Sequence, residues 1–144
     1  MKNILLSFLI IFLCITCSDS TSPKNVDEYL ITSILEDIES DFSFGYIDSI
    51  MDHYHPNFLH NENNFADEQV IWEIRLLEYN EIEFTEIEIS INDNFANAEF
   101  VMKLSSGEEI DIFNEPDDNG DISYLYYDLD EWKICGNNFS VKKD

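Results

Sequence analysis

Basic residues are scarce in this sequence. Its 144 residues include only 7 Lys and Arg against 31 Asp and Glu, which gives a formal net charge of −24 with neutral His. Binding of nucleic acid requires a Lys/Arg surface that faces the phosphates, and binding to anionic lipid headgroups requires a basic cluster. Seven scattered basic residues supply neither, so we expect no nucleic-acid partner and no electrostatic contact with a lipid surface.

The sequence also lacks an apolar run of the length that crosses a membrane. Residues 4–15 are apolar apart from Ser7, whereas a spanning helix needs about 20 such residues. Because Lys2 supplies a short positive segment before it, the run is typical of the hydrophobic part of a signal peptide.

The segment after this run resembles the start of a bacterial lipoprotein. Cys17 ends the run and precedes a polar, Ser-rich stretch, residues 18–23. In lipoproteins such a cysteine becomes the first mature residue and carries the lipid, so the resemblance implies a lipidation site at Cys17. It also implies an extracytoplasmic protein of the bacterial cell envelope, whose membrane contact is the lipid anchor alone. The alternative is an ordinary signal peptide that is cleaved without lipidation.

Cysteine pairs that could stabilise a fold are missing as well. Of the three cysteines, Cys14 and Cys17 have redox spacing but lie at the apolar run with no preceding fold. A lipidated Cys17 leaves Cys135 without a partner in the mature chain, so the domain must be held by its core. Such a core is available, because 44% of the residues are hydrophobic and 14% are aromatic, which also argues against disorder.

Helical periodicity dominates the first half of the chain. Apolar residues recur every three or four positions over residues 26–40 and again over residues 47–54, where Pro56 should end the second helix. Asn64 is a candidate N-cap for a third helix. We expect the buried face of this third helix to consist of Val70, Ile71, Ile74 and Leu77.

After Asn80 the period of the hydrophobic residues changes to two. The alternation slips at Thr85–Glu86, which predicts a bulge in the first long strand. Further strands are predicted around residues 96–104, 110–112, 122–127 and 132–135. Three helices followed by an antiparallel meander give an α+β fold. We therefore expect a signal peptide at 1–16, the lipidated cysteine and a tether at 17–25, one domain at 26–137 and a tail at 138–144.

Several short motifs together resemble the nuclear transport factor 2-like (NTF2-like, SnoaL-like) superfamily. They are residues 55–59 (His-Pro-Asn-Phe-Leu), Trp72, residues 94–98, residues 124–126 (Tyr-Leu-Tyr) and residues 132–136 (Trp-Lys-Ile-Cys-Gly). The resemblance implies a cystatin-like cone, in which a strongly curved antiparallel sheet wraps a long helix and encloses a pocket.

The resemblance also suggests where chemistry could take place. Enzymes of the superfamily use an Asp or His inside the cone, with a pKa that burial has moved towards neutrality. The catalytic candidates here are Asp48, His53 and Tyr54, although Asp48 is more simply explained as a solvated helix residue. The candidates for ligand binding are Tyr54, Trp72 and Tyr126, which could equally be packing aromatics.

Two segments resemble metal sites without meeting their requirements. All three His residues fall within residues 53–60, but Pro56 redirects the chain between them. Residues 115–121 resemble a calcium loop, yet Tyr126 occupies the position where an EF-hand needs a bidentate Glu. We interpret residues 115–121 as an acidic turn, with weak cation binding as the alternative, and we predict no metal site and no cofactor.

Three functions remain open at this stage. The leading hypothesis is a non-enzymatic, membrane-anchored domain that binds a small apolar or amphipathic ligand, or a protein partner, in or around the cone pocket. The second is an isomerase- or dehydratase-like enzyme with a buried Asp or His as general base. The third is a homodimeric interaction subunit that pairs through its sheet face. The fold alone does not choose among them.

Overall fold

The three helices and the long antiparallel strands follow one another in the order that the sequence predicts, and a short two-stranded hairpin lies between the second and the third helix. The computed structural model describes residues 23–140. The helices are α1 (Pro23–Phe44), α2 (Ile47–Asp52) and α3 (Phe65–Glu78). The strands are β1 (Leu59–His60), β2 (Asn63–Asn64), β3 (Glu81–Asn92), β4 (Phe95–Ser106), β5 (Glu109–Glu115), β6 (Tyr124–Asp128) and β7 (Glu131–Ile134). The predicted α+β class is confirmed.

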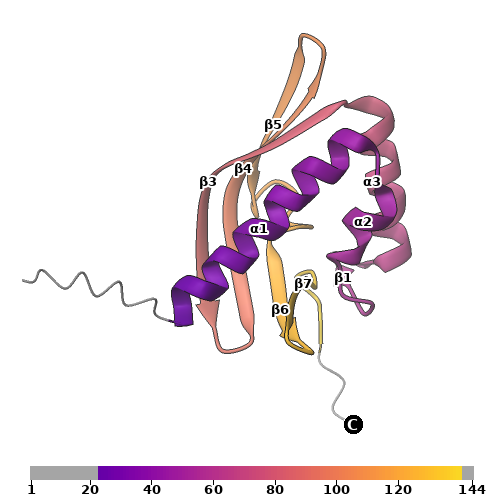
Figure 1. The fold of residues 1–144 in the computed structure, drawn as a ribbon. Coiled ribbons are helices and arrows are strands. Elements are labelled where there is room, and N and C mark those ends of the chain that lie inside the picture. Colours follow the sequence, from indigo (N-terminus) through magenta and orange to yellow (C-terminus); the bar gives the residue numbers. More distant parts are fainter. Residues whose placement is uncertain (1–22, 141–144) are drawn as a thin grey trace, which may run out of the picture.

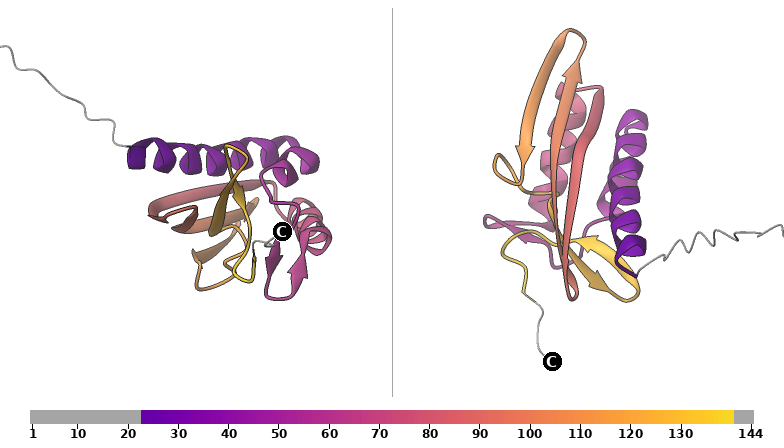
Figure 2. Two further views of the ribbon diagram at one scale, coloured as in Figure 1. Left: turned by 90° about the horizontal axis from the view of Figure 1, so that it is seen from below. Right: turned by 90° about the vertical axis from the view of Figure 1, so that its left-hand side faces the viewer.

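The long strands form a strongly curved sheet against α1. The strand order is β3-β4-β6-β7, and β5 pairs with the second half of β4 while β6 pairs with its first residues. Figure 1 shows α1 lying across the concave face, and Figure 2 shows the strands curling beneath it. Three residues on the inward side of α1 are each at most 2% exposed, namely Ile31, Leu35 and Ile38. These residues pack against the inner face of the sheet and form the hydrophobic core of the domain.

A β-bulge in β3 adjusts the inner face of the sheet. The register of β3 against β4 shifts between Thr85 and Glu88, and Glu86 has a positive φ of 57°. The shift lets Phe84 and Ile89, which differ in parity, both turn towards the core. The irregularity predicted at Thr85–Glu86 is therefore confirmed.

The start of α3 also agrees with its prediction. Asn64 Oδ1 accepts hydrogen bonds from the backbone N–H groups of Ala66 at 2.8 Å and Asp67 at 3.3 Å. The Asp67 carboxylate accepts in return from the Asn64 backbone N–H at 3.0 Å. This reciprocal capping box satisfies the free amides of the first turn and fixes the direction in which α3 leaves the β1–β2 hairpin.

The predicted buried face of α3 is wrong. Val70, Ile74 and Leu77 are 51%, 47% and 86% exposed, and Ile71 is only half-buried. The residues that α3 turns inward are Glu68, Trp72 and Arg75. The apolar pattern misled the prediction because the inward face carries polar side chains that bond to other parts of the protein, with Glu68 accepting from Tyr54 and Arg75 donating to Asp121. The bonding is incomplete, since the second carboxylate oxygen of Glu68 and Arg75 Nη1 have no hydrogen-bond partner among the described residues.

Smaller differences concern the ends of elements. Helix α1 extends beyond the predicted 26–40 at both ends, α2 ends at Asp52, and β6 begins two residues later than expected.

None of the helices within residues 23–140 is long and apolar enough to span a bilayer. The predicted signal peptide and the lipidation site at Cys17 lie outside the described residues.

Candidate functional site

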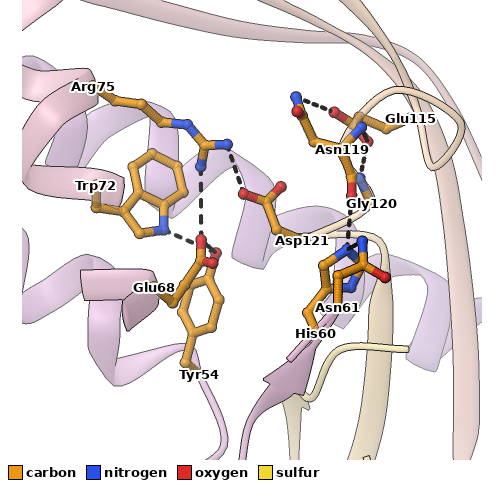
Figure 3. Close-up of polar contacts among 10 residues, drawn as sticks. All are labelled: Tyr54, His60, Asn61, Glu68, Trp72, Arg75, Glu115, Asn119, Gly120 and Asp121. Carbon is orange, nitrogen blue, oxygen red and sulfur yellow. Dashed lines mark hydrogen bonds and ion pairs between the residues drawn. The ribbon is translucent and has the colours of Figure 1, made fainter. Parts of the chain in front are cut away.

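A buried polar cluster lies on the inward face of α3. Glu68, Trp72 and Arg75 follow one another at i, i+4 and i+7, so they share one side of the helix. They are 0%, 0% and 8% exposed. Tyr54, which follows α2, and Asp121, in the loop before β6, converge on the same point (Figure 3). We call these five residues the Glu68 cluster.

Hydrogen bonds and one ion pair connect the members of the Glu68 cluster. Trp72 Nε1 donates to the Tyr54 hydroxyl at 2.9 Å, and that hydroxyl donates to Glu68 Oε1 at 3.4 Å. Arg75 Nη2 donates to Asp121 Oδ2 at 2.6 Å, while Arg75 Nη1 lies 3.7 Å from Glu68 Oε1. The guanidinium carbon is also 4.8 Å from the centre of the Trp72 ring, within cation–π range. One cation thus faces two carboxyl groups.

Burial sets the protonation state of this cluster. Burial, and after it the nearby Asp121 carboxylate, together raise the pKa of Glu68 to about 9 although Arg75 acts in the opposite direction. Burial raises the pKa of Tyr54 as well. For Arg75, burial favours the neutral form, but Asp121 and Glu68 outweigh it and the pKa is raised. The geometry pairs Arg75 with Asp121, and burial favours the uncharged form of the neighbouring Glu68.

The polar region continues outward through a closed acidic turn. The Glu115 carboxylate accepts from the backbone and side-chain N–H groups of Asn119, both at 3.1 Å, and from the Gly120 backbone N–H. His60 Nε2 lies 2.7 Å from the Asn119 carbonyl oxygen, while its Nδ1 accepts from the Asn137 backbone N–H. These bonds agree with the acidic turn predicted for residues 115–121.

A small polar pocket of about 220 Å³ opens beside the Glu68 cluster. It is lined by His60, Asn61, Asn63, Ile71, Arg75, Asp118, Asn119 and Asp121. Arg75 and Asp121 form part of its wall, whereas Glu68 lies behind them with no exposed surface. A molecule in this pocket would contact Arg75 and Asp121 but would not reach the carboxyl group of Glu68.

A larger pocket, of about 330 Å³, lies on the outward face of the sheet. Asn97 of β4 pairs with Tyr124 of β6. In β4, Asn97 lies between Ala96 and Ala98, which are both buried towards the core. Alternation along a strand therefore places Asn97 and Tyr124 on the face away from α1. We call this site the aromatic pocket. Its lining residues are Ser90, Ile91, Asn92, Phe95, Ala96, Asn97, Tyr124, Cys135, Gly136, Asn137 and Phe139.

Phe139 forms one wall of the aromatic pocket. Its ring centre lies 4.7 Å from that of His55, 5.1 Å from that of Tyr126 and 6.4 Å from that of Phe95. These edge and tilted contacts hold the segment after β7 against the outer face of the sheet. The pocket consequently has an aromatic side that is fixed by packing with its neighbours.

The aromatic pocket is free of side-chain charge in a strongly acidic protein. Its lining includes no Asp, Glu, Lys, Arg or His, and the polar groups present are hydroxyls, amides and one thiol. Burial raises the pKa of that Cys135 thiol to about 12, so it stays protonated at neutral pH. The amides of Asn92 and Asn97 can orient a ligand that the aromatic rings contact, whereas the Asn137 amide is bonded to Asn61.

The predicted site residues occupy different regions of the structure. Tyr54 and Trp72 are brought together in the Glu68 cluster by a hydrogen bond. Asp48 is exposed on α2, and His53 caps the end of α2, where burial lowers its pKa. Tyr126 packs on Phe139 at the outer face, away from the two other aromatic candidates.

Sequence reasoning did not identify Glu68, Arg75 or Asp121. The helical spacing of Glu68, Trp72 and Arg75 was available as a signal, because it places two polar residues and an aromatic on one face. No such signal was available for Asp121, since it comes from a loop 46 residues after Arg75.

Among residues 23–140, no group of three or more His, Cys, Asp or Glu side chains is arranged to hold a metal ion.

Neither a protein-family model nor a curated protein matches the sequence. Solved structures do resemble it. An NTF2-like protein of unknown function from Shewanella oneidensis is 19% identical over 78% of this chain and 95% of its own, with a TM-score of 0.58. A candidate scytalone dehydratase from Novosphingobium aromaticivorans is 9% identical over 83% of this chain and 91% of its own, with a TM-score of 0.57.

A protein from Bdellovibrio bacteriovorus is also similar, with 13% identity, a TM-score of 0.61 and coverage of 83% of this chain. This chain spans only 44% of that protein's length. At these identities the similarity establishes the fold and leaves the activity open. The chain has the NTF2-like, cystatin-like cone fold, as its sequence motifs imply.

Proposed function

We propose that this protein is a membrane-anchored, extracytoplasmic NTF2-like domain that binds a small, uncharged apolar or amphipathic ligand in the aromatic pocket. The observation that carries the proposal is a pocket of about 330 Å³ without a charged side chain, in a chain with a net charge of −24. Aromatic walls and a few side-chain amides are the usual lining of small-molecule sites.

The pocket favours a particular class of ligand. The rings of Phe95, Tyr124 and Phe139 offer apolar contact to a flat or branched hydrocarbon group. The side-chain oxygen of Asn97, which is buried and has no hydrogen-bond partner among the described residues, offers an acceptor that suits a hydroxyl or amide on the ligand. A charged ligand would find no counterion among the lining residues.

Acid–base catalysis is a weaker candidate on the same geometry. What favours it is the uncharged Glu68 beside Arg75 and Tyr54, because a carboxyl group with a raised pKa can act as a general acid. A general acid must also come within hydrogen-bond reach of its substrate, and Glu68 has no exposed surface. We therefore assign the proposed function to ligand binding.

Removal of one aromatic wall should weaken ligand binding. For this test we would purify residues 18–144, search for a co-purified ligand by native mass spectrometry, and titrate the protein with the neutral fluorophore N-phenylnaphthylamine. Phe139→Ala should raise the Kd of the fluorophore at least about tenfold, or ~1.4 kcal/mol, because the ligand loses an aromatic contact. Phe44→Ala removes an aromatic that is 66% exposed outside this pocket and serves as the matched control. Equal Kd values for both variants, or no binding to the parent, would contradict the proposal.

The anchor is tested separately from the pocket. Cys17→Ser in the full-length chain removes the thiol that would carry the lipid, so the protein should move from the membrane fraction to the soluble envelope fraction. Cys135→Ser removes the buried thiol and should leave the distribution unchanged. Retention of the Cys17→Ser protein in the membrane fraction would show that something other than a lipid on Cys17 holds it there.

A further inference from the structure

The outward face of α3 carries apolar side chains that the other described residues, within 23–140, cover only in part. Val70, Ile74 and Leu77 are 51%, 47% and 86% exposed, and exposed Ala66 precedes them by one turn. Their spacing places all four on one side of the helix, opposite the inward Glu68 cluster. We call Ala66, Val70, Ile74 and Leu77 the α3 stripe. It extends over about 17 Å at the helical rise of 1.5 Å per residue.

A hollow continues the stripe at its N-terminal end. This pocket, of about 510 Å³, lies between the segment before β1 and the first turn of α3, and Ala66 belongs to both surfaces. Its lining includes no charged side chain. It consists of Pro56, Asn57, Phe58, Leu59, Asn64, Phe65, Ala66, Asn138 and Ser140. The stripe and the hollow together offer a ridge with an adjoining site for one large apolar side chain.

The charges beside the stripe are all of one sign. Glu73 lies along one flank, and Asp67 and Glu78 lie along the other, and all three are exposed. Arg75, the only basic residue of α3, points inward and is paired with Asp121. A second copy of this chain would bring the same acidic flanks and a net charge of −24 to the contact, so self-association is opposed by repulsion.

We propose that the α3 stripe is a docking surface for an amphipathic helix of a partner protein, whose apolar ridge is flanked by Lys or Arg on both sides. The apolar ridge of the partner would pack along the stripe as one helix packs on another. The basic flanks would face Glu73 on one side and Asp67 and Glu78 on the other, which gives the contact its orientation. This surface is distinct from the aromatic pocket, so it concerns a second partner and not the small ligand.

The test uses peptides of defined chemistry, because the partner is not identified. Residues 18–144, which contain every helix and strand described, are titrated with an amphipathic Leu/Lys helical peptide. A scrambled peptide of the same composition and a Leu/Glu version of the helix serve as comparisons. We expect the Leu/Lys helix to bind with a Kd in the micromolar range and the other two peptides to bind at least about tenfold more weakly. Amide chemical-shift changes should map to the outward face of α3.

Matched surface variants separate the stripe from general charge attraction. The double variant Val70→Ser/Leu77→Ser should raise the Kd of the Leu/Lys helix at least about tenfold, whereas Leu129→Ser, at an 89% exposed leucine elsewhere, should change it less than about twofold. Both substitutions affect exposed side chains and should leave the fold intact, as circular dichroism will check. The proposal would be overturned if the Leu/Lys helix does not bind, or if the scrambled peptide binds equally well. It would also be overturned if the amide chemical-shift changes map to a surface other than α3, or if the protein forms a stable homodimer through α3.

Discussion

Replacement of Glu68 by glutamine should make the protein more stable at pH 8 and reduce the dependence of its stability on pH. In the folded protein burial raises the pKa of Glu68 to about 9, whereas the unfolded chain has the ordinary value near 4.5. The folded state therefore binds one more proton than the unfolded state between these two values. Its contribution is fully present below pH 4.5 and is lost as the pH rises towards 9, so stability falls over this window.

Glutamine cannot ionise, so Glu68→Gln removes this loss while it retains the shape and one hydrogen-bonding oxygen of the side chain. We expect a gain on the order of 2–4 kcal/mol at pH 8 and little change near pH 4.5. Urea unfolding at pH 4.5, 6.5 and 8 measures the difference. Glu73→Gln, an exposed glutamate of the same helix, is the matched control and should show no such trend. A Glu68→Gln effect of the same size at every pH would refute the assigned protonation state.

Replacement of Arg75 by methionine should cost the protein much of its stability. Arg75 is 8% exposed and donates to Asp121 at 2.6 Å, and Asp121 is itself only 5% exposed. Methionine leaves that buried carboxylate without a cation. Because an uncompensated buried charge is strongly unfavourable, we expect a loss of about 3–5 kcal/mol in the free energy of unfolding.

An exposed ion pair provides the control for Arg75→Met. Lys103 donates to Glu83 at 3.0 Å on the outer face of the sheet, so Lys103→Met should cost less than about 1 kcal/mol. The double variant Arg75→Met/Asp121→Asn removes the orphaned charge and should recover part of the loss. If Arg75→Met and Lys103→Met cost the same, or if the double variant recovers nothing, the ion pair is not what holds the cluster.

Local features of the fold could be predicted from the sequence. Asn64 and Asp67 identify the start of α3 because their side chains satisfy the free amides of the first turn within four residues. The change of parity at Thr85–Glu86 locates the bulge in β3, because the hydrophobic residues themselves record which side faces the core. Both signals depend on neighbours in the chain.

The candidate sites could be predicted only in part. The sequence indicates Tyr54 and Trp72 as ligand-binding or packing aromatics, but it gives no sign that Glu68 is buried beside them as their hydrogen-bonding partner. The aromatic pocket combines residues of β3, β4, β6 and the segment after β7. No spacing within one segment predicts such a site, because the sheet register decides which strands become neighbours.

The sequence by itself determined the order of helices and strands, the cap of α3, the bulge of β3 and the acidic character of the surface. Only the tertiary structure decided which side of α3 faces the core, because helical periodicity groups residues on a face without saying which face is buried. Asp121 arrives opposite Arg75 from a distant loop, and its charge makes an inward arginine stable there. Together with the Tyr54 hydroxyl, which bonds Trp72 and Glu68, this contact holds the polar side of α3 inward and leaves the α3 stripe on the surface.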